Sequence, residues 1–551
     1  MQIAVLKQSS IALKYIFQLL FFFLVGIFKT NAQQVIVPPR SNDSVRVILI
    51  KQAKSLREKN IDSATIIKTA ACEVIIVEGR TTTNCDSAVY NQRTNILEAF
   101  GNIHINDADS IHTYAQYLRY IGLDRIAYLK KNVRLTDKKG TLYTDDLEYN
   151  LRTGIATYKN GGRVVNGKTI LTSKEGIYYA DSKDIYFKKN VHFKDDNNTI
   201  ITDSLLYNLK TGIATFIAPT NIKSKDGTEI NTKSGTYNLN TGEAIFYDRT
   251  TYKDSTHSIT GDKMAFDKKS GTVQIDGNGK LVDSANQVTV IGNSIFLDVN
   301  KNAFLATRKP VMIFYRDGDS TYLAADTIFS GLRKYDSLER RMAIKNDTLK
   351  KVEVIDGSKS KDSSIRYFLA FHNVRIFNDS LQAVSDSLHY STSDSTFKLF
   401  GNPLVWNAQT QVKGDTIHMY TENQKPKRLY VFNNGLIINE ANKALYNQIG
   451  GRTINAYFKD GQIDYVRVKG SPAESIFYPQ DDDSAYTGMN RSSGDVIDIF
   501  FVNKELNKVK FIKDVDGIMY PINQIPADKK ELKGFMWLDK RRPKNKLALF
   551  E

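Results

Sequence analysis

The sequence has 551 residues, 41% of them hydrophobic and 25% charged, with 76 Lys and Arg against 60 Asp and Glu. This apolar content excludes a disordered chain, and the negative mean hydropathy excludes a polytopic helical membrane protein. Two cysteines exclude a disulfide scaffold or a Cys-rich zinc site, while 29 Tyr and 28 Phe beside 11 Pro favour β-strands over helices.

The first 32 residues have the pattern of a secretory signal peptide. Lys7 and Lys14 precede an apolar run at residues 15–28, and small residues follow it at 30–32. The run is shorter than the roughly 20 residues that a membrane-spanning helix needs, although an uncleaved anchor is the alternative. We therefore predict a signal peptide at 1–32 and export of the remaining chain.

A linker is predicted at residues 33–71, before the first repeated segment. Cys72 and Cys85 flank the start of the repeats. In an oxidising compartment the two thiols either pair or stay free, because a spacing of 13 residues does not fix their geometry.

An internal repeat of about 30 residues organises residues 72–330. The segments DLEYNLRTGIATY (146–158) and SLLYNLKTGIATF (204–216) are two copies of one unit. The aromatic anchors of eight copies lie 28 to 30 residues apart, at Tyr90, Tyr120, Tyr149, Tyr179, Tyr207, Tyr237, Phe266 and Phe296. Eight copies at so constant a period indicate a stacked repeat architecture.

Each unit has the residue alternation of a β-hairpin. Apolar residues occupy every second position around Tyr149 and Tyr207, and a Lys/Arg-Thr-Gly turn follows, in which Gly154 and Gly212 accept a left-handed conformation at little cost. Two strands per repeat, about 4.8 Å apart, would extend over roughly 75–80 Å in eight copies.

One face of the superposed copies is apolar. The position nine residues after the anchor is apolar in seven copies, with Lys188 as the exception. Stacking would join these faces into a continuous channel, although aromatic side chains filling a closed core is the alternative. The predicted channel residues are Tyr90, Tyr120, Tyr149, Tyr158, Tyr179, Tyr207, Phe216, Tyr237, Phe246, Phe266 and Phe296.

Five segments carry a resemblance to a known family. They are CDSA (85–88), EAFGNIHI (98–105), LYTDDLEY (142–149), AFHNVRIF (370–377) and AVSDSL (383–388). With the repeats, they resemble the OstA-like family, the periplasmic lipopolysaccharide-transport proteins of the LptA type, and most closely the long form of Bacteroidota. The similarity covers most of residues 72–515.

The resemblance implies an elongated, twisted β-jellyroll with acyl chains inside and sugars outside. It implies that the channel residues contact lipid, and that the ligand is lipopolysaccharide or a similar anionic glycolipid. Partners would be inner- and outer-membrane transport proteins of related β-fold, joined by edge-strand pairing, with self-association left open.

The second half departs from the regular repeat. Residues 331–365 are crowded with Lys and Asp, which predicts a charged insert or hinge. Residues 366–525 are predicted as a second, related β-module, and 526–551 as a basic tail. The tail either docks on an acidic partner or on lipid headgroups, or is solvated.

Catalytic and metal-binding patterns are not found in the sequence. The seven His form no ligand motif, no nucleophile elbow or phosphate loop occurs, and Asp481–Asp483 read as an exposed loop. The basic charge is diffuse, which argues against nucleic acid. We predict a non-enzymatic periplasmic carrier without cofactor or metal, with association with the outer membrane left open. The alternatives are a carbohydrate-binding or adhesive β-solenoid and a periplasmic component of an outer-membrane assembly complex.

Overall fold

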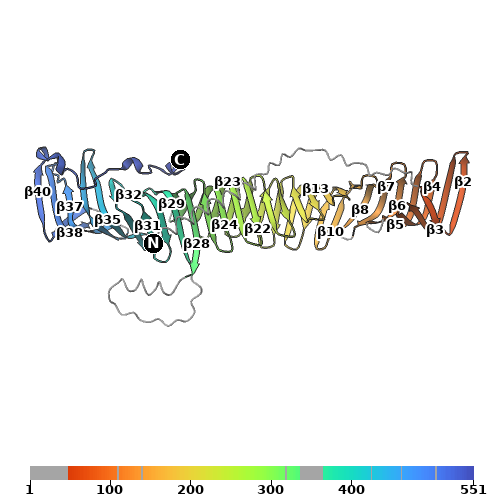
Figure 1. Cartoon of the computed structure of the whole chain (residues 1–551), viewed down its shortest axis with the longest axis horizontal. Coiled ribbons are helices and arrows are strands. Elements are labelled where there is room, and N and C mark those ends of the chain that lie inside the picture. The colour runs from red at the N-terminus through yellow and green to blue at the C-terminus, as the bar shows by residue number, and fades with distance from the viewer. Residues whose placement is uncertain are drawn as a thin grey trace, which may run out of the picture.

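The computed structural model describes residues 47–107, 111–137, 140–316, 319–334, 364–422, 425–460, 462–502 and 505–550. These residues form forty strands in one long, twisted sheet, with four short 3-10 helices after the last strand (Figure 1). The predicted all-β, elongated fold is confirmed. The predicted signal peptide at 1–32 lies outside the described residues.

The long strands bend and contribute to two facing halves of the sheet, here called arm A and arm B. They are β3 (Thr65–Glu78), β4 (Thr81–Asn91), β5 (Ile96–Asp107), β6 (Ile111–Ile121), β7 (Ile126–Thr136), β8 (Thr141–Asn150), β13 (Asp184–Lys194), β14 (Asn198–Asn208), β23 (Thr272–Asp283), β24 (Val288–Asp298), β29 (Ser364–Phe377), β30 (Gln382–Ser391), β35 (Lys425–Asn442), β36 (Leu445–Lys459), β37 (Gln462–Phe477) and β38 (Gly488–Val502).

Short strands lie in one arm only. Those of arm A are β2 (Ser55–Asp62), β9 (Ile155–Tyr158), β12 (Glu175–Tyr179), β15 (Ile213–Phe216), β18 (Gly235–Asn238), β19 (Glu243–Phe246), β22 (Lys263–Asp267), β25 (Ala303–Thr307), β28 (Thr327–Lys334), β31 (Thr396–Phe400), β34 (Thr416–Glu422) and β39 (Glu505–Ile512). Those of arm B are β1 (Leu49–Gln52), β10 (Gly162–Asn166), β11 (Thr169–Ser173), β16 (Thr220–Ser224), β17 (Glu229–Thr232), β20 (Thr250–Lys253), β21 (His257–Gly261), β26 (Val311–Arg316), β27 (Asp319–Ala324), β32 (Leu404–Asn407), β33 (Thr410–Lys413) and β40 (Asp516–Pro521).

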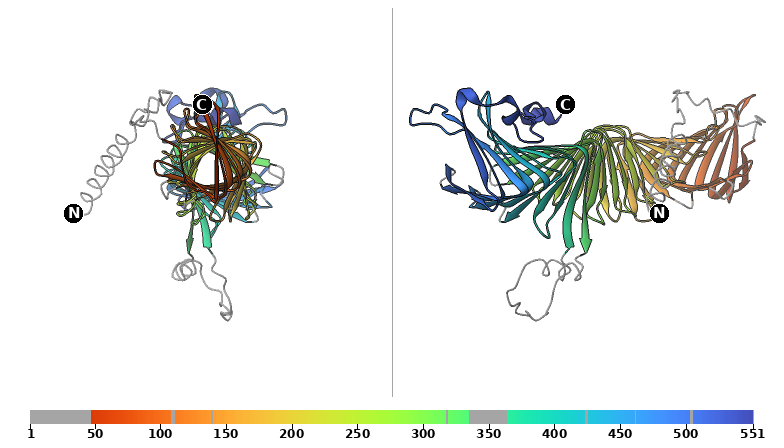
Figure 2. Two further views of the ribbon diagram at one scale, coloured as in Figure 1. Left: turned by 90° about the vertical axis from the view of Figure 1, so that its right-hand side faces the viewer. Right: turned by 60° about the vertical axis from the view of Figure 1, so that its left-hand side comes forward.

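The bend between the arms is a β-bulge that recurs along the molecule. In β7 the pairing register shifts between Lys130 and Val133, and the two residues between them, Lys131 and Asn132, have φ of 65° and 52°. Asn tolerates this left-handed conformation better than most residues. The strands therefore fold over on themselves, and the two arms enclose one interior, as the end-on view in Figure 2 shows.

Turns at the free end of arm A follow from the repeated Asn. The Oδ1 atom of Asn150 accepts hydrogen bonds from the backbone N–H groups of Arg152 and Thr153, and Gly154 follows with φ of 68°. Two repeats later, Asn208 accepts the same two bonds from the residues that follow it. This side-chain turn fixes the hairpin register.

The folded part begins earlier than the predicted boundary at residue 72. Strands β1, β2 and the first half of β3 occupy residues 49–71, where a linker was expected, and both β1 and β2 pair with β3. The alternation in this segment is weak because the residues of β2 are exposed, so the apolar pattern did not reveal it.

The predicted second module is a continuation of the first. Strands β28 and β29 pair over eight positions, from Thr327 with Phe371 to Lys334 with Ser364, so the sheet passes without interruption from one half to the other. Residues 335–363, most of the predicted insert, lie outside the described residues.

The C-terminal segment folds back along the molecule. It contains η1 (Ile522–Gln524), η2 (Ala527–Lys529), η3 (Asp539–Arg541) and η4 (Lys546–Leu549), and it runs over arm B of the C-terminal half (Figure 1). We call residues 522–550 the C-terminal strap. From the sequence, we expected this tail to dock on an acidic partner or on lipid headgroups, or to be solvated. In the structure it packs instead on the outer surface of the protein itself.

Candidate functional site

The interior between the arms is built from alternate side chains of both arms. In β7, for example, Ala127, Leu129, Val133 and Leu135 are buried, whereas Lys130 between them is exposed. One cluster of buried apolar residues extends from Ile48 in the first residues described to Ile499 in β38. The period-two alternation of the repeats therefore produces the predicted continuous apolar interior.

Nine of the eleven predicted channel residues face this interior. Seven are buried, namely Tyr90, Tyr120, Tyr149, Tyr158, Tyr207, Phe216 and Phe246. Tyr237 and Phe266 are partly buried and pack against the same cluster.

The other two predicted residues, Tyr179 and Phe296, lie outside the interior. Phe296 is 40% exposed, while its neighbours Ile295 and Leu297 are buried. Tyr179 follows the inward-facing Tyr178 in β12, so it points to the opposite side of the strand.

Both copies fit the pattern when the anchor is moved by one residue, from Tyr179 to Tyr178 and from Phe296 to Leu297. Counted from Tyr178, the position nine residues later is the fully buried Phe187 instead of Lys188, and the exception in the sequence pattern disappears. Counted from Leu297, the same position is the buried Ala306.

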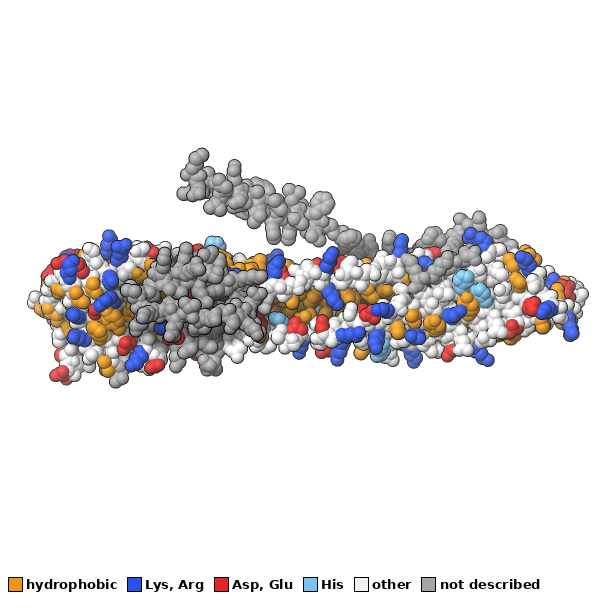
Figure 3. Space-filling model, turned by 90° about the horizontal axis from the view of Figure 1, so that it is seen from below, with side chains coloured by type: hydrophobic (Ala, Val, Ile, Leu, Met, Phe, Trp, Pro, Cys, Tyr) orange, Lys and Arg blue, Asp and Glu red, His pale blue; other side chains and the backbone are white. Residues whose placement is uncertain are grey.

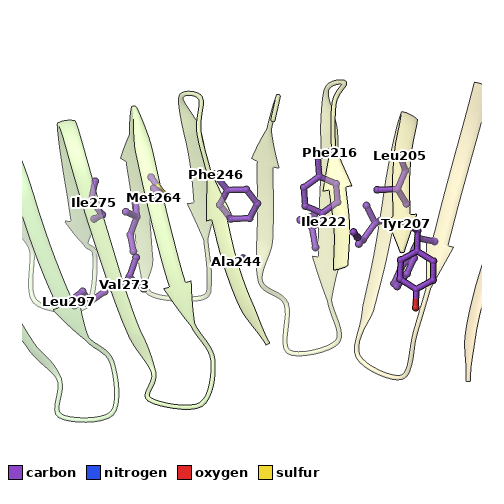
Figure 4. Packing of buried hydrophobic residues seen from close by; sticks show 14 of the residues in the cluster. Leu205, Tyr207, Phe216, Ile222, Ala244, Phe246, Met264, Val273, Ile275 and Leu297 are labelled. Carbon is purple, nitrogen blue, oxygen red and sulfur yellow. The ribbon is translucent and has the colours of Figure 1, made fainter. Parts of the chain in front are cut away.

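In the middle of the molecule the interior is filled. The rings of Phe216 and Phe246 are essentially inaccessible and lie 6.3 Å apart between centroids, and Phe246 meets Phe266 edge-on at 5.6 Å. Figure 4 shows the rings of Phe216 and Phe246 in line with Leu205, Ile275 and other apolar side chains along successive strands. Here the structure has the filled core that the sequence left as the alternative to an open channel.

Towards the N-terminal end the arms enclose empty space. A pocket of about 610 Å³, which includes space open to solvent, is lined mainly by apolar side chains, among them Ile76, Leu118 and Tyr149. Thr81, Thr83 and the carboxylates of Glu78 and Asp107 also line it. We call it the N-terminal pocket.

A second pocket of about 400 Å³ lies between the arms near the start of the C-terminal half. Its apolar lining includes Leu281, Val290 and Phe304. The guanidinium of Arg366 also lines it and donates to Asn302 Oδ1 at 2.8 Å. Burial lowers the pKa of Arg366.

Polar contacts bridge the free ends of the two arms along the first half. Tyr120 of arm A donates to Glu78 of arm B at 2.7 Å, and Tyr178 donates to Asp137 at 3.0 Å. Lys183 also donates to Asp137, at 3.3 Å. Two repeats later, Asn198 Nδ2 donates to the Tyr237 hydroxyl at 3.2 Å. We call these bonds the mouth contacts; they hold the arms together at the opening of the interior.

The mouth tyrosines keep their protons. Burial and then the hydrogen bond to Glu78 raise the pKa of Tyr120, while burial and then the charge of Asp137 raise that of Tyr178. Both hydroxyls are therefore hydrogen-bond donors at any physiological pH.

The cysteines are free thiols in this structure. Cys72 is exposed at the β3 bulge, and Cys85 is buried in the interior. Burial raises the pKa of Cys85 to about 11, so it behaves as an apolar group at neutral pH.

Among the residues that the structure describes, no three His, Cys, Asp or Glu side chains gather to hold a metal ion. Within the same part of the chain, no helix is both long enough and apolar enough to span a bilayer.

Sequence reasoning missed the mouth contacts and the strap. The residues of each mouth contact lie 39 to 46 positions apart, so no local pattern connects them. The one signal for the mouth contacts is that the anchor residue is Tyr rather than Phe in most copies. A buried Tyr hydroxyl requires a hydrogen-bond partner, so these tyrosines indicate polar partners nearby.

Fold and interior together define a repetitive β-jellyroll whose two arms enclose an apolar core that is filled in part and contains the two pockets described above. The family model described as OstA-like protein matches residues 45–200 and 187–262, in agreement with the resemblance that the sequence predicted. A search among curated proteins found no match to the chain.

Proposed function

We propose that the chain is a non-enzymatic carrier in the periplasm that holds the acyl chains of lipopolysaccharide, or of a similar anionic glycolipid, between its arms. The observation that carries this proposal is the N-terminal pocket, an apolar space continuous with the interior of an OstA-like sheet. Each CH₂ group that moves from water into such a space gains about 0.8 kcal/mol.

Lipid would move along the interior by exchange of apolar contacts. In the filled section an acyl chain replaces contacts between apolar side chains, such as that of Phe216 with Phe246, with contacts of the same kind. The headgroup stays outside the opening, because burying an unpaired polar group costs several kcal/mol. Lys and Arg side chains are spread along the length of the molecule, as the face in Figure 3 shows, and suit an anionic headgroup.

The two ends of the sheet support pairing with partners of similar fold. In the described structure β2 pairs only with β3, while β39 and β40 pair only with β38. Leu56 and Ile61 at one end and Ile518 and Met519 at the other are at least half exposed. Open strand edges with apolar side chains favour the addition of another strand, so transport proteins at either membrane are the proposed partners.

Site-specific photocrosslinking in cells tests the carrier function. A photoreactive residue at Tyr149, which lines the N-terminal pocket, should form lipopolysaccharide adducts, and one at the adjacent, outward-facing Glu148 should not. Adducts at Tyr207 and Phe246 would further show that lipid passes through the filled section. Absence of lipid adducts at all three interior positions would refute the proposal.

A cavity-filling substitution provides an independent test. Ala127 is buried and lines the N-terminal pocket, so Ala127→Phe should occupy part of its volume. We expect lipid binding to fall while far-ultraviolet circular dichroism stays unchanged. Tyr128→Phe, on the outer side of the same strand, is the matched control.

A further inference from the structure

The outer face of arm A carries a belt of aromatic side chains in the C-terminal half. It crosses six neighbouring strands, β31 and β34 to β38, each paired with the next. We call it the aromatic belt; it consists of Phe400, His418, Tyr420, Tyr430, Phe432, Tyr457, Tyr465 and Phe500.

The rings are in contact and accessible. Ring centroids are 4.6 Å apart for His418 and Phe432, 5.6 Å for Tyr457 and Tyr465, and 5.1 Å for Tyr465 and Phe500. Tyr457 is 39% exposed and Phe500 36%, while the residues just before them in sequence, Ala456 and Ile499, belong to the interior. With strands about 4.8 Å apart, six of them give a platform about 24 Å long.

Hydrogen-bonding and charged groups lie among the rings. The Arg428 guanidinium lies 5.0 Å from the Tyr430 centroid and 5.6 Å from those of Tyr420 and Tyr457, and it donates to Asn455 Oδ1. Arg467 lies 5.8 Å from Tyr465 and forms a bidentate pair with Asp498, at 2.7 Å for both bonds.

The charge beyond these pairs is positive. Lys469 is exposed on β37, and Lys508 and Lys510 are exposed on β39, the strand next to β38. Lys510 is near enough to Asp498 to lower the pKa of that carboxyl, after the larger effect of Arg467. Asp498 itself is neutralised by Arg467. The belt therefore favours an anion over a cation.

In this half of the molecule, the outer face of arm B differs from the outer face of arm A. Apolar residues on the outer face of arm B, such as Trp406 and Ile438, are buried beneath the C-terminal strap. The hydrogen bonds of the strap join it to arm B, so that among the described residues the strap leaves the aromatic belt uncovered.

We propose that the aromatic belt binds a carbohydrate chain that carries negative charge. A sugar ring presents an apolar C–H face, which packs on aromatic rings, and hydroxyl groups, which hydrogen-bond to side chains such as Arg428 and Asn455. Phosphate or carboxylate groups on the chain pair with Arg and Lys. The glycan is either the sugar part of the proposed glycolipid cargo or a separate polysaccharide.

The proposal goes beyond the carrier function and does not require lipid in the interior. Its site lies on the opposite side of arm A from the core, so the two ideas fail independently. Failure of lipid crosslinking at Tyr149 would leave the belt intact, and failure of glycan binding would leave the pocket intact.

Binding of lipid-free probes to the intact chain tests the proposal. The probes are polygalacturonate oligosaccharides, the polysaccharide released from lipopolysaccharide by mild acid, and neutral dextran, measured by isothermal calorimetry. We expect binding of an anionic glycan that weakens as salt rises. Binding only of the released polysaccharide would identify the cargo as the source, and binding of polygalacturonate as well would indicate a general anionic-glycan surface.

Paired substitutions locate the site. Tyr457→Leu with Tyr465→Leu removes two rings but keeps apolar surface, and we expect about a tenfold loss of affinity. Arg428→Gln should weaken the binding of the anionic probes and change the salt dependence of that binding. The control replaces Tyr128 and Tyr186, on the outer face of arm A in the first half, by Leu.

Two results would overturn the proposal. One is no binding of any glycan by a chain whose circular dichroism shows it folded. The other is equal affinity of an anionic glycan for the parent and for the Tyr457→Leu, Tyr465→Leu chain, which would show that positive charge acts alone.

Discussion

At the scale of single residues, the mouth contacts join polar groups that would each be costly to bury alone. The Asp137 carboxyl is only 5% exposed, and both the Tyr178 hydroxyl and the Lys183 ammonium donate to it. A buried carboxylate is stable when such donors surround it. The contact therefore fixes the distance between arm A and arm B at one point of the opening.

Replacing Tyr178 by Phe should loosen this point. The variant removes one donor and leaves Asp137 with less compensation, at a cost of about 1–3 kcal/mol in the free energy of unfolding. Urea denaturation measures the change. Tyr186→Phe, on the outer face of the neighbouring strand, should stay within about 0.5 kcal/mol of the parent. An equal effect of both substitutions would show that the bond to Asp137 adds nothing.

His418 in the aromatic belt should make the protein sensitive to acid. Burial, followed by the charge of Lys398, lowers the pKa of this imidazole to about 4 from the ordinary 6.5. As pH falls below 6.5 the unfolded chain takes up a proton that the folded chain refuses. The stabilising contribution is thus complete above pH 6.5 and is lost as pH falls towards 4.

The measurement compares urea denaturation at pH 7.5 and pH 4.5. His418→Phe should lose less stability than the parent between these two values, because it has no imidazole to protonate. Tyr420→Phe, at a ring next to His418, is the control. A parent-like pH dependence in His418→Phe would contradict the assignment.

At the scale of elements, three buried glutamines hold the C-terminal strap. Gln448 accepts from Leu532 N at 2.8 Å and donates to Lys530 O at 2.9 Å, and Gln411 makes the same pair of bonds with Leu538 N and Met536 O. Gln382 accepts from the side chain of Arg542. Each amide of Gln448 and Gln411 thus pairs with the strap as a neighbouring strand would.

Loss of these amides should release the strap. In Gln411→Ala with Gln448→Ala, the strap loses four hydrogen bonds and its backbone groups are left without those partners, at about 1–3 kcal/mol per site. We expect trypsin to cleave the strap, which contains Lys529 and Lys530, faster than in the parent. Gln462→Ala, at an exposed position, is the control. Unchanged cleavage would show that apolar contacts alone hold the strap.

The elements also show what the sequence can and cannot predict. The hairpins follow from Asn150 and Gly154 and from strict alternation, so they could be placed in advance. The bends have a weaker signal in the sequence, an Asn as the second of the two bulge residues, as in Lys131-Asn132 and Asn433-Asn434. An Asn in such a pair is equally typical of an ordinary turn. The contacts of the three glutamines with the strap join residues 82 to 160 positions apart, which no local pattern contains.

At the scale of the whole molecule, the same alternation predicts the interior but not its width. Ala127 and Ala156 occupy the same position of the repeat and are both buried. Ala127 nevertheless lines the N-terminal pocket, whereas Ala156 packs in the filled section. The difference depends on how far apart the arms lie, and that distance is set by contacts between arms. Residue type at one position therefore predicts burial, and the three-dimensional structure is needed to separate pocket from core.

Continuity of the sheet across residue 334 is the property on which a single path through the molecule depends. Lys334 and Ser364 form the last of eight pairs between β28 and β29, so the two ends of the intervening segment are already neighbours in one ladder. A short turn is enough to connect two such ends. A shorter connection also has a smaller entropic cost of closure than a longer one.

Replacing residues 335–363 by Asn-Gly should therefore preserve the fold. Asn-Gly is the preferred two-residue hairpin turn, and the eight pairs from Thr327 to Lys334 remain available on both sides of it. We expect one cooperative thermal transition at a temperature equal to or above that of the full chain. Photoreactive residues at Tyr149 and Tyr390, interior positions on either side of the replaced segment, should both still form lipid adducts in cells. Two separate transitions, or adducts confined to Tyr149, would show that the segment joins two independent units instead of interrupting one sheet.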